Sequence, residues 1–355
     1  MDILITVLLS FCGGVAATCI GALGSVILCA FVALAGICGV MAGCEFNIVL
    51  NFAFGYFLSP HMGLGPAACA LGYAKKRGYV EDSKGIGLPL MMLGKADVLV
   101  VGGLFAIASH YICVGLQTAL PGKIDAVSST IVIAGLVAKL LFGNEGLIGK
   151  VPEGDKRFGV NSKNNWMPHM PFGDGINYWL FSACAGCISA WLWWEINDYG
   201  IQVGSEAIQI IAQFPIFALA VIFLILLVCG LPCPVWHHIG LTSSYAAMTA
   251  FAYGANEMEV LLWGIAWGAV CHFVADFLAD IFLVYGDGYV DPPSMTMMVC
   301  SIFIYIIFPA IGLYNGALMI ATPVVLIVVS AVLAVIFKMK RNQQIAAQPA
   351  EPAEA

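Results

Sequence analysis

The sequence predicts an all-α polytopic integral membrane protein with about eleven transmembrane helices, arranged as two inverted five-helix repeats and one C-terminal helix. Hydrophobic residues make up 61% of the chain and charged residues only 10%, whereas soluble domains keep roughly a quarter of their residues charged. Continuously apolar stretches of about 20 residues, enough for a helix to cross the hydrocarbon core, recur along the chain. In addition, four short segments occur twice in the same order.

Charges, prolines and glycines separate the apolar stretches. The expected spans are 4–21, 25–43, 46–74, 95–118, 126–142, 177–194, 207–229, 235–253, 258–284, 293–311 and 317–337. No basic residue precedes the first stretch, so we expect a retained helix rather than a cleaved signal peptide. Four glycines within or just after the first span permit close helix contact, within the chain or in a homo-oligomer. They are Gly13, Gly14, Gly21 and Gly24.

The basic residues predict an orientation. With a cytoplasmic C-terminal tail, counting the spans backwards places every Lys and Arg except Lys123 on or near the cytoplasmic face, as the positive-inside rule requires. The N-terminus and the acidic loop 195–206 are then expected outside, and the chain in the cytoplasmic membrane.

The repeated segments predict an internal duplication. Segments 10–17, 59–74, 97–110 and 122–131 resemble 182–189, 236–251, 259–272 and 288–297, at offsets of 172, 177, 162 and 166 residues. Polar residues align as well as apolar ones. The aligned pairs are His61 with His238, His110 with His272, Asp125 with Asp291, Ser128 with Ser294, and Thr130 with Thr296.

The duplication predicts the domain organisation. The first repeat occupies 1–142 and the second 177–311, joined by a cytoplasmic linker, 143–176. A further helix follows at 312–337, and then a disordered cytoplasmic tail, 338–355. Because five spans are an odd number, the second repeat enters the membrane from the opposite side, an architecture typical of secondary transporters. The linker residues Trp166, Met167, His169 and Met170 are expected to form an interfacial foot.

The third element of each repeat, near 46–74 and 235–253, is expected to be a broken or re-entrant helix. Prolines precede a shared His-x-Gly-Leu motif in both copies, and proline interrupts a helix. The half-helix that follows would present free N–H groups, which attract anions. The simpler alternative is a kinked helix with an interfacial histidine. The candidate pathway residues are His61, Gly63, His238, Gly240, Thr242 and Ser243.

His110 and His272 are expected midway along their helices. Ionisable groups at that depth usually face the bundle interior, so the pair is a candidate lining for a central site. His272, Asp276 and Asp280 are spaced by four residues and therefore share one helical face, a pattern typical of a proton or cation relay. The first repeat has no carboxylate at the equivalent positions, so the relay would be asymmetric. Alternatively, the histidines bond backbone carbonyls and Asp280 faces water.

Asp125 and Asp291 each precede an expected helix, with a serine three residues later and a threonine five residues later. The simplest interpretation is helix N-capping, and the alternative is a polar mouth on either side of the membrane. The serines and threonines are Ser128, Thr130, Ser294 and Thr296.

Known catalytic motifs are absent from the sequence: there is no Walker A loop, dinucleotide-binding glycine pattern or HExxH motif. We therefore expect no enzyme activity and no cofactor. Thirteen cysteines lie mostly singly in apolar stretches. The pairs Cys184/Cys187 and Cys229/Cys233 could bind a metal or form a redox pair, but helix packing is the favoured interpretation.

The leading functional hypothesis is a secondary transporter that moves a small polar solute or ion by alternating access, with proton or cation coupling through His110, His272, Asp276 and Asp280. A passive channel on the same frame is the first alternative. A membrane redox subunit with haem on facing histidines, or a structural subunit, is less favoured. The expected partners are the lipid bilayer and the solute, a homo-oligomer is left open, and no nucleic-acid partner is expected.

Overall fold

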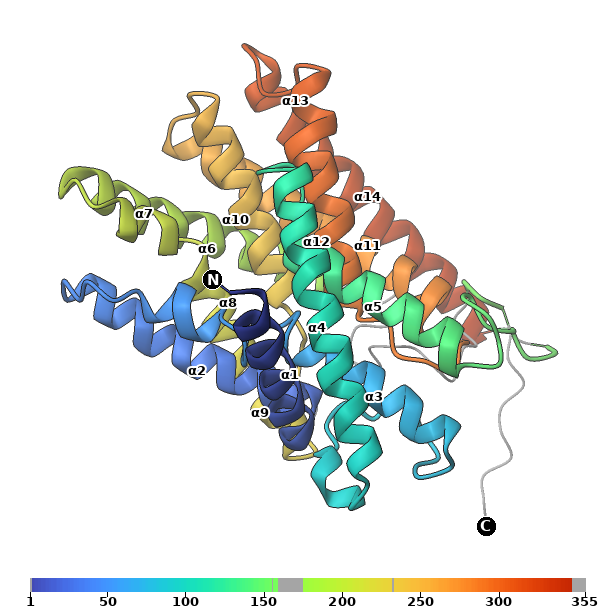
Figure 1. Cartoon of the computed structure of the whole chain (residues 1–355). Coiled ribbons are helices and arrows are strands. Elements are labelled where there is room, and N and C mark those ends of the chain that lie inside the picture. The colour runs from blue at the N-terminus through green and yellow to red at the C-terminus, as the bar shows by residue number, and fades with distance from the viewer. Residues whose placement is uncertain (1, 155, 159–174, 232, 347–355) are drawn as a thin grey trace.

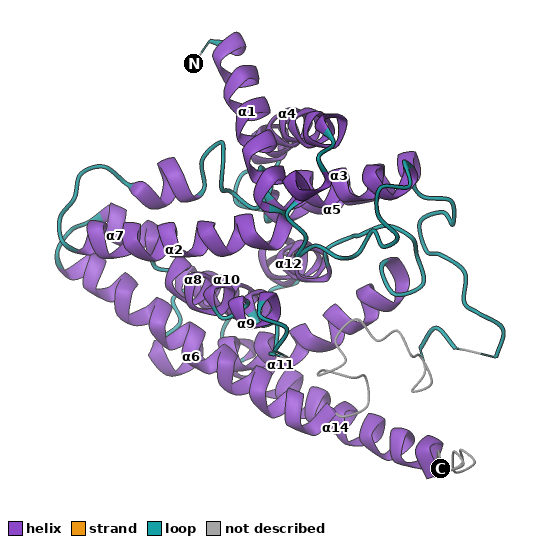
Figure 2. Ribbon diagram, turned by 90° about the horizontal axis from the view of Figure 1, so that it is seen from below, coloured by secondary structure: helices purple, strands orange, loops and turns teal. Residues whose placement is uncertain are grey.

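The computed structural model describes residues 2–154, 156–158, 175–231 and 233–346 (Figure 1). All regular elements in these ranges are helices, and Figure 2 shows them without strands. The α-helices are α1 (Ile3–Ile20), α2 (Ala22–Met41), α3 (Leu64–Lys76), α4 (Ala96–Ala119), α5 (Ala126–Phe142), α6 (Gly175–Gln202), α7 (Glu206–Ile211), α8 (Phe214–Ile222), α9 (Ile225–Val228), α10 (His237–Ala252), α11 (Glu257–Phe282), α12 (Pro292–Ile302), α13 (Phe308–Ala310) and α14 (Leu318–Ala346). Val49–Ala53 and Phe303–Ile307 are π-helical, and Leu90–Leu93 is a 3₁₀ turn.

The described helices have the length and composition of an α-helical membrane protein. Seven helical segments in these ranges are long and apolar enough to cross a bilayer, and α5 is apolar but shorter. The prediction of a helical membrane protein is therefore supported, whereas the predicted number of eleven crossings is not established. The expected linker foot, Trp166, Met167, His169 and Met170, lies outside the described residues.

The helix is interrupted at the first expected place, whereas at the second a loop precedes one continuous helix, α10. Between the π-helix at Val49–Ala53 and α3, residues 54–63 form turns and bends that contain Pro60. In the second half, residues 233–236 are non-helical and α10 begins at His237. The predicted span 207–229 is divided as well, into the short helices α7, α8 and α9.

Two helix crossings depend on glycine. In the crossing of α1 and α4, a Cβ atom at Gly14 would overlap Ala106, and one at Gly102 would overlap Thr18. In the crossing of α6 and α11, a Cβ atom at Gly186 would overlap the backbone of Gly264. Small residues let helix backbones approach closely, so that van der Waals contact can hold the helices together in lipid.

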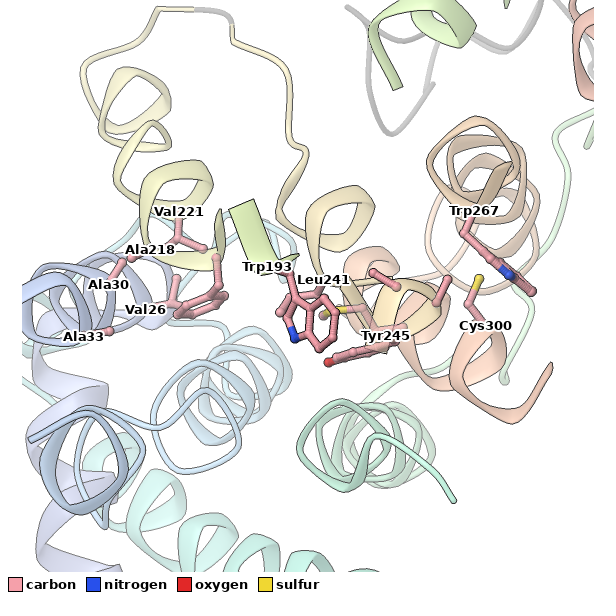
Figure 3. Close-up of a cluster of buried hydrophobic side chains, with 14 of the residues drawn as sticks. Val26, Ala30, Ala33, Trp193, Ala218, Val221, Leu241, Tyr245, Trp267 and Cys300 are labelled. Carbon is pink, nitrogen blue, oxygen red and sulfur yellow. The ribbon is translucent and has the colours of Figure 1, made fainter. Parts of the chain in front are cut away.

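The two halves of the chain meet through helices α2 and α8, and through α5 and α12. Figure 3 shows Val26 and Ala30 of α2 facing Ala218 and Val221 of α8 within the largest buried apolar cluster. Small and branched apolar side chains of the two helices therefore bury one another at this interface.

Helices α5 and α12 overlap in opposite directions. The backbone N–H of Asp125, just before α5, donates to Ser301 near the end of α12 over 3.0 Å. Midway along α5, a Cβ atom at Gly135 would lie 3.1 Å from the carbonyl oxygen of Tyr289, just before α12. The two helices are therefore antiparallel where they overlap, and their N-termini lie inside the bundle at opposite ends of this overlap.

Three cationic side chains bind the carbonyl oxygens at the C-terminal end of α11. Lys84, in the loop after α3, donates to Val284 over 2.9 Å, and Lys139 of α5 donates to Phe282. Arg157 donates to Asp280 over 3.0 Å. Cations are favourable at a helix C-terminus, where carbonyl groups lack partners in the helix. We call Lys84, Lys139 and Arg157 the basic clamp.

Candidate functional site

A cavity of about 1010 Å³ lies between the two halves of the chain. Residues of α2, α3 and α5 line it from the first half, and residues of α8, α10 and α12 from the second. Most of the wall is apolar, as at Phe54, Phe217 and Met297. A mostly apolar cavity with a few convergent polar groups is typical of a small-molecule site. The ionisable residues that line it are His61, Lys84, Asp125, His237, Tyr245, Tyr289, Asp291 and Tyr305.

Asp125 caps α5 at the cavity wall. Its carboxylate accepts a hydrogen bond from the backbone N–H of Ser128 over 2.9 Å and another from the Ser128 hydroxyl over 2.6 Å. The Tyr245 hydroxyl of α10 donates to the same carboxylate over 2.8 Å. The predicted capping role is confirmed, and Tyr245 adds a contact between the two halves of the chain.

Asp291 caps α12 in the same way. It accepts from the backbone N–H of Ser294 over 2.9 Å, and the Ser294 hydroxyl also donates to it. Tyr289 donates to the other carboxylate oxygen over 2.8 Å. Both aspartates therefore accept three hydrogen bonds, and each offsets the positive end of its helix.

His61 and His237 bring imidazole groups to the wall, at or just before the start of α3 and α10. His61 is 8% exposed, and its Nδ1 lies 2.8 Å from the Ser59 hydroxyl oxygen. His237 is the first residue of α10. Neither helix start is capped by a side chain.

The other residues predicted around the broken elements lie behind the wall. Gly63 approaches Ser25, and Gly240 approaches Ile216. The Thr242 hydroxyl donates to the backbone carbonyl of His238 over 2.8 Å. These residues, together with Ser243, are buried in helix contacts rather than in the cavity wall.

Thr130 and Thr296 each form a hydrogen bond within their own helix. Each hydroxyl donates to the carbonyl four residues earlier, that of Ala126 over 2.7 Å and that of Pro292 over 2.8 Å. Both are fully buried outside the wall. Of the matched Asp, Ser and Thr pairs in this pattern, the aspartates and serines line the cavity and the threonines do not.

The matched histidines of α4 and α11 are absent from the cavity wall. His110 is partly buried, with its ring 5.1 Å from that of Tyr56. His272 and Asp280 are buried, and Asp276 is half-buried, all along α11. An ion path through these residues stays a prediction, and it would run beside the cavity rather than across it.

Five ionisable residues of the cavity wall were missed by the sequence analysis: Lys84, His237, Tyr245, Tyr289 and Tyr305. Tyr289 lies two residues before the predicted Asp291, and His237 is adjacent to the predicted His238, so sequence proximity could have suggested both. Lys84 lies in the loop after α3, where partial burial lowers its pKa. Lys84 and Tyr245 reach the wall only through packing of distant segments, for which the sequence carries no local signal.

Metal-binding groups are absent from the described part of the chain, where no three His, Cys, Asp or Glu side chains cluster. All thirteen cysteines are free thiols, including Cys184, Cys187, Cys229 and Cys233.

The fold and the cavity define a helical membrane protein with a small-molecule-sized site between two sets of helices. The model of a family of unknown function, DUF7973, matches residues 1–323, and the chain belongs to this family. Comparison with curated proteins gives no match, and comparison with solved structures gives none either.

Proposed function

We propose that the protein is a secondary transporter that moves a small polar solute or ion across the cytoplasmic membrane by alternating access. The observation that carries this proposal is the cavity of about 1010 Å³, whose wall both halves of the chain share. A site between two such units can be exposed to one side and then the other when the units rock against each other.

The helix crossings support an internal duplication. Gly14 and Gly186 are related by the predicted offset of 172 residues, and Gly102 and Gly264 by the offset of 162. Gly14 of α1 lies against Gly102 and Ala106 of α4. Gly186 of α6 lies against the equivalent residues of α11, Gly264 and Gly268. A Cβ atom at Gly102 would overlap the side chain of Thr18, and a Cβ atom at Gly264 would overlap the side chain of Ala190. Thr18 and Ala190 are again 172 residues apart.

The contacts between the halves also support two inverted units. Equivalent elements meet each other, α2 with α8 and α5 with α12, as expected around a pseudo-twofold axis. Eleven crossings, an outside N-terminus and a cytoplasmic C-terminus belong to this proposal, because five spans per unit produce the inversion.

The proposed coupling ion is a proton or another cation, which moves along α11. Asp276 and Asp280 follow His272 at intervals of four residues, so all three lie on one face of the helix. Carboxylates inside a membrane protein usually belong to ion pathways. His110 would contribute from α4, where it packs against Tyr56 and where no carboxylates stand at the positions equivalent to Asp276 and Asp280.

Flux measurements in proteoliposomes test the proposal. Vesicles that contain a pH-sensitive dye are exposed to amino acids, organic acids and inorganic ions, with and without imposed proton or sodium gradients. We expect at least one solute to enter saturably and to respond to one gradient. Asp276→Asn should abolish the gradient response, whereas Glu257→Gln, at the exposed start of the same helix, should preserve it.

Two outcomes contradict the proposal. Unitary currents in planar bilayers would identify a passive channel, since a carrier shows slow, saturable turnover. The absence of gradient-driven flux for every solute in vesicles with folded, correctly inserted protein would exclude a coupled transporter. A haem absorption band in the purified protein would favour the redox alternative.

A further inference from the structure

Two of the four helix starts at the cavity lack a carboxylate cap. Asp125 and Asp291 cap α5 and α12, whereas α3 and α10 have no side-chain cap. At α10, the backbone N–H groups of His237 and Ile239 have no acceptor among the described residues. This helix has 16 residues, so its start carries the partial positive charge that attracts anions.

Two imidazoles with unused nitrogen atoms accompany these helix starts. His61 is 8% exposed, and its ring has no hydrogen bond in the described parts of the chain beyond the contact of Nδ1 with Ser59. The Nδ1 atom of His237 is buried and has no hydrogen-bond partner there. A buried polar atom without a partner costs about 1–3 kcal/mol, so the cavity has a hydrogen-bonding nitrogen atom, His237 Nδ1, that its own residues do not satisfy.

We propose that the cavity binds the carboxylate group of a small molecule with an apolar body. The first turn of α10 and the His237 ring hold the carboxylate, and His61 supplies a further polar contact in the wall. The ligand carboxylate thus takes the place at α10 that Asp125 and Asp291 take at α5 and α12. Only the identification of this ligand as the transported solute rests on the proposed function.

The charges of the wall disfavour a multiply charged anion, because the described part of the wall holds one lysine together with the carboxylates of Asp125 and Asp291, each of which already accepts three hydrogen bonds. Among the described residues that line the cavity, Lys84 is the only lysine and no arginine is present; Lys84 also donates to the carbonyl of Val284. A phosphate carries more charge than this set of donors can balance. The wall is mostly apolar, as at Phe54 and Met297, and therefore accommodates an aliphatic or aromatic body.

Binding of matched acids and amides tests this inference. Calorimetry on the full chain in lipid nanodiscs compares butanoate, 4-methylpentanoate and phenylacetate with the corresponding neutral amides, and with 3-methylbutylamine as a cationic probe. We expect at least one acid to bind about tenfold or more tightly than its amide, because a charged acceptor forms the stronger hydrogen bonds. The amine should bind more weakly than the acid.

Histidine variants locate the site. His237→Gln should weaken binding of the preferred acid about tenfold, and His61→Gln should weaken it less. Tyr111→Phe, at an exposed position outside the cavity wall, is the control and should leave binding unchanged. If His237→Gln does not fold, the acid and amide comparison in the unaltered protein decides.

Three results would overturn the inference: equal binding of acid and amide, tighter binding of the amine, or no binding of any acid. Binding without gradient-driven transport would contradict only the proposed function. Coupled transport of a solute that lacks a carboxylate would contradict only this inference.

Discussion

At the scale of single residues, the two aspartate caps differ in their partners, because only Asp125 contacts the other half of the chain. Asp125 organises its own helix through Ser128 and also accepts a hydrogen bond from Tyr245, 120 residues away. Asp291 receives its third hydrogen bond from Tyr289, only two residues before it. Loss of the Tyr245 hydroxyl should therefore weaken the contact between the halves, whereas loss of the Tyr289 hydroxyl should not.

Tyr245→Phe should lower the thermal unfolding midpoint of the purified protein. The substitution removes one hydrogen bond to a carboxylate, worth about 1–3 kcal/mol, without changing the ring. Tyr111→Phe, at a largely exposed tyrosine, is the matched control and should leave the midpoint unchanged. Equal midpoints for Tyr245→Phe and the unaltered protein would show that the contact contributes no stability.

Lys139→Met should destabilise the protein more than Lys76→Met. Lys139 is 1% exposed and donates to the carbonyl of Phe282, so its loss leaves a buried acceptor without a partner, at a cost of about 1–3 kcal/mol. Lys76 also donates to a carbonyl, that of Leu141, but at an exposed position where water can replace it. Chemical denaturation in detergent measures both, and a larger effect at Lys76 would contradict the prediction.

At the scale of elements, the glycine crossings determine how closely helices approach. Gly264→Ala should destabilise the crossing of α6 and α11, because the new methyl group would overlap Ala190. Gly115→Ala, in α4, meets open space and should be neutral or stabilising by up to about 1 kcal/mol, since alanine favours the helix. The unfolding midpoint should fall for Gly264→Ala and stay equal or rise for Gly115→Ala, and a stabilised Gly264→Ala would refute the close contact.

Local sequence patterns predicted where helices end, but they did not predict the contacts between distant helices. The spacing of Asp125 and Ser128 was sufficient to predict a cap, because the cap is complete within three residues. The break before α3 followed from Pro60. In contrast, periodicity could not show that His110 packs against Tyr56, or that Lys84 reaches the end of α11. Such contacts depend on how distant helices pack.

At the scale of the whole molecule, the proposed inversion requires equivalent loops to lie on opposite sides of the membrane. Short epitope tags inserted after Gly78 and Gly254, both exposed, should be accessible from opposite sides in intact cells. A tag at Ala355 should share the side of Gly78, because the positive-inside rule places both in the cytoplasm. Labelling of Gly78 and Gly254 from one side would refute the inverted arrangement.

The basic clamp has a consequence for biogenesis. Lys84, Lys139 and Arg157 emerge from the ribosome before α11, whose carbonyl groups they bind. Until α11 has been inserted, these three cations, two in the first half and one in the linker, have no such acceptors. A nascent chain stalled before α11 should therefore be recognised by quality-control proteases, even though all of its own helices have been made.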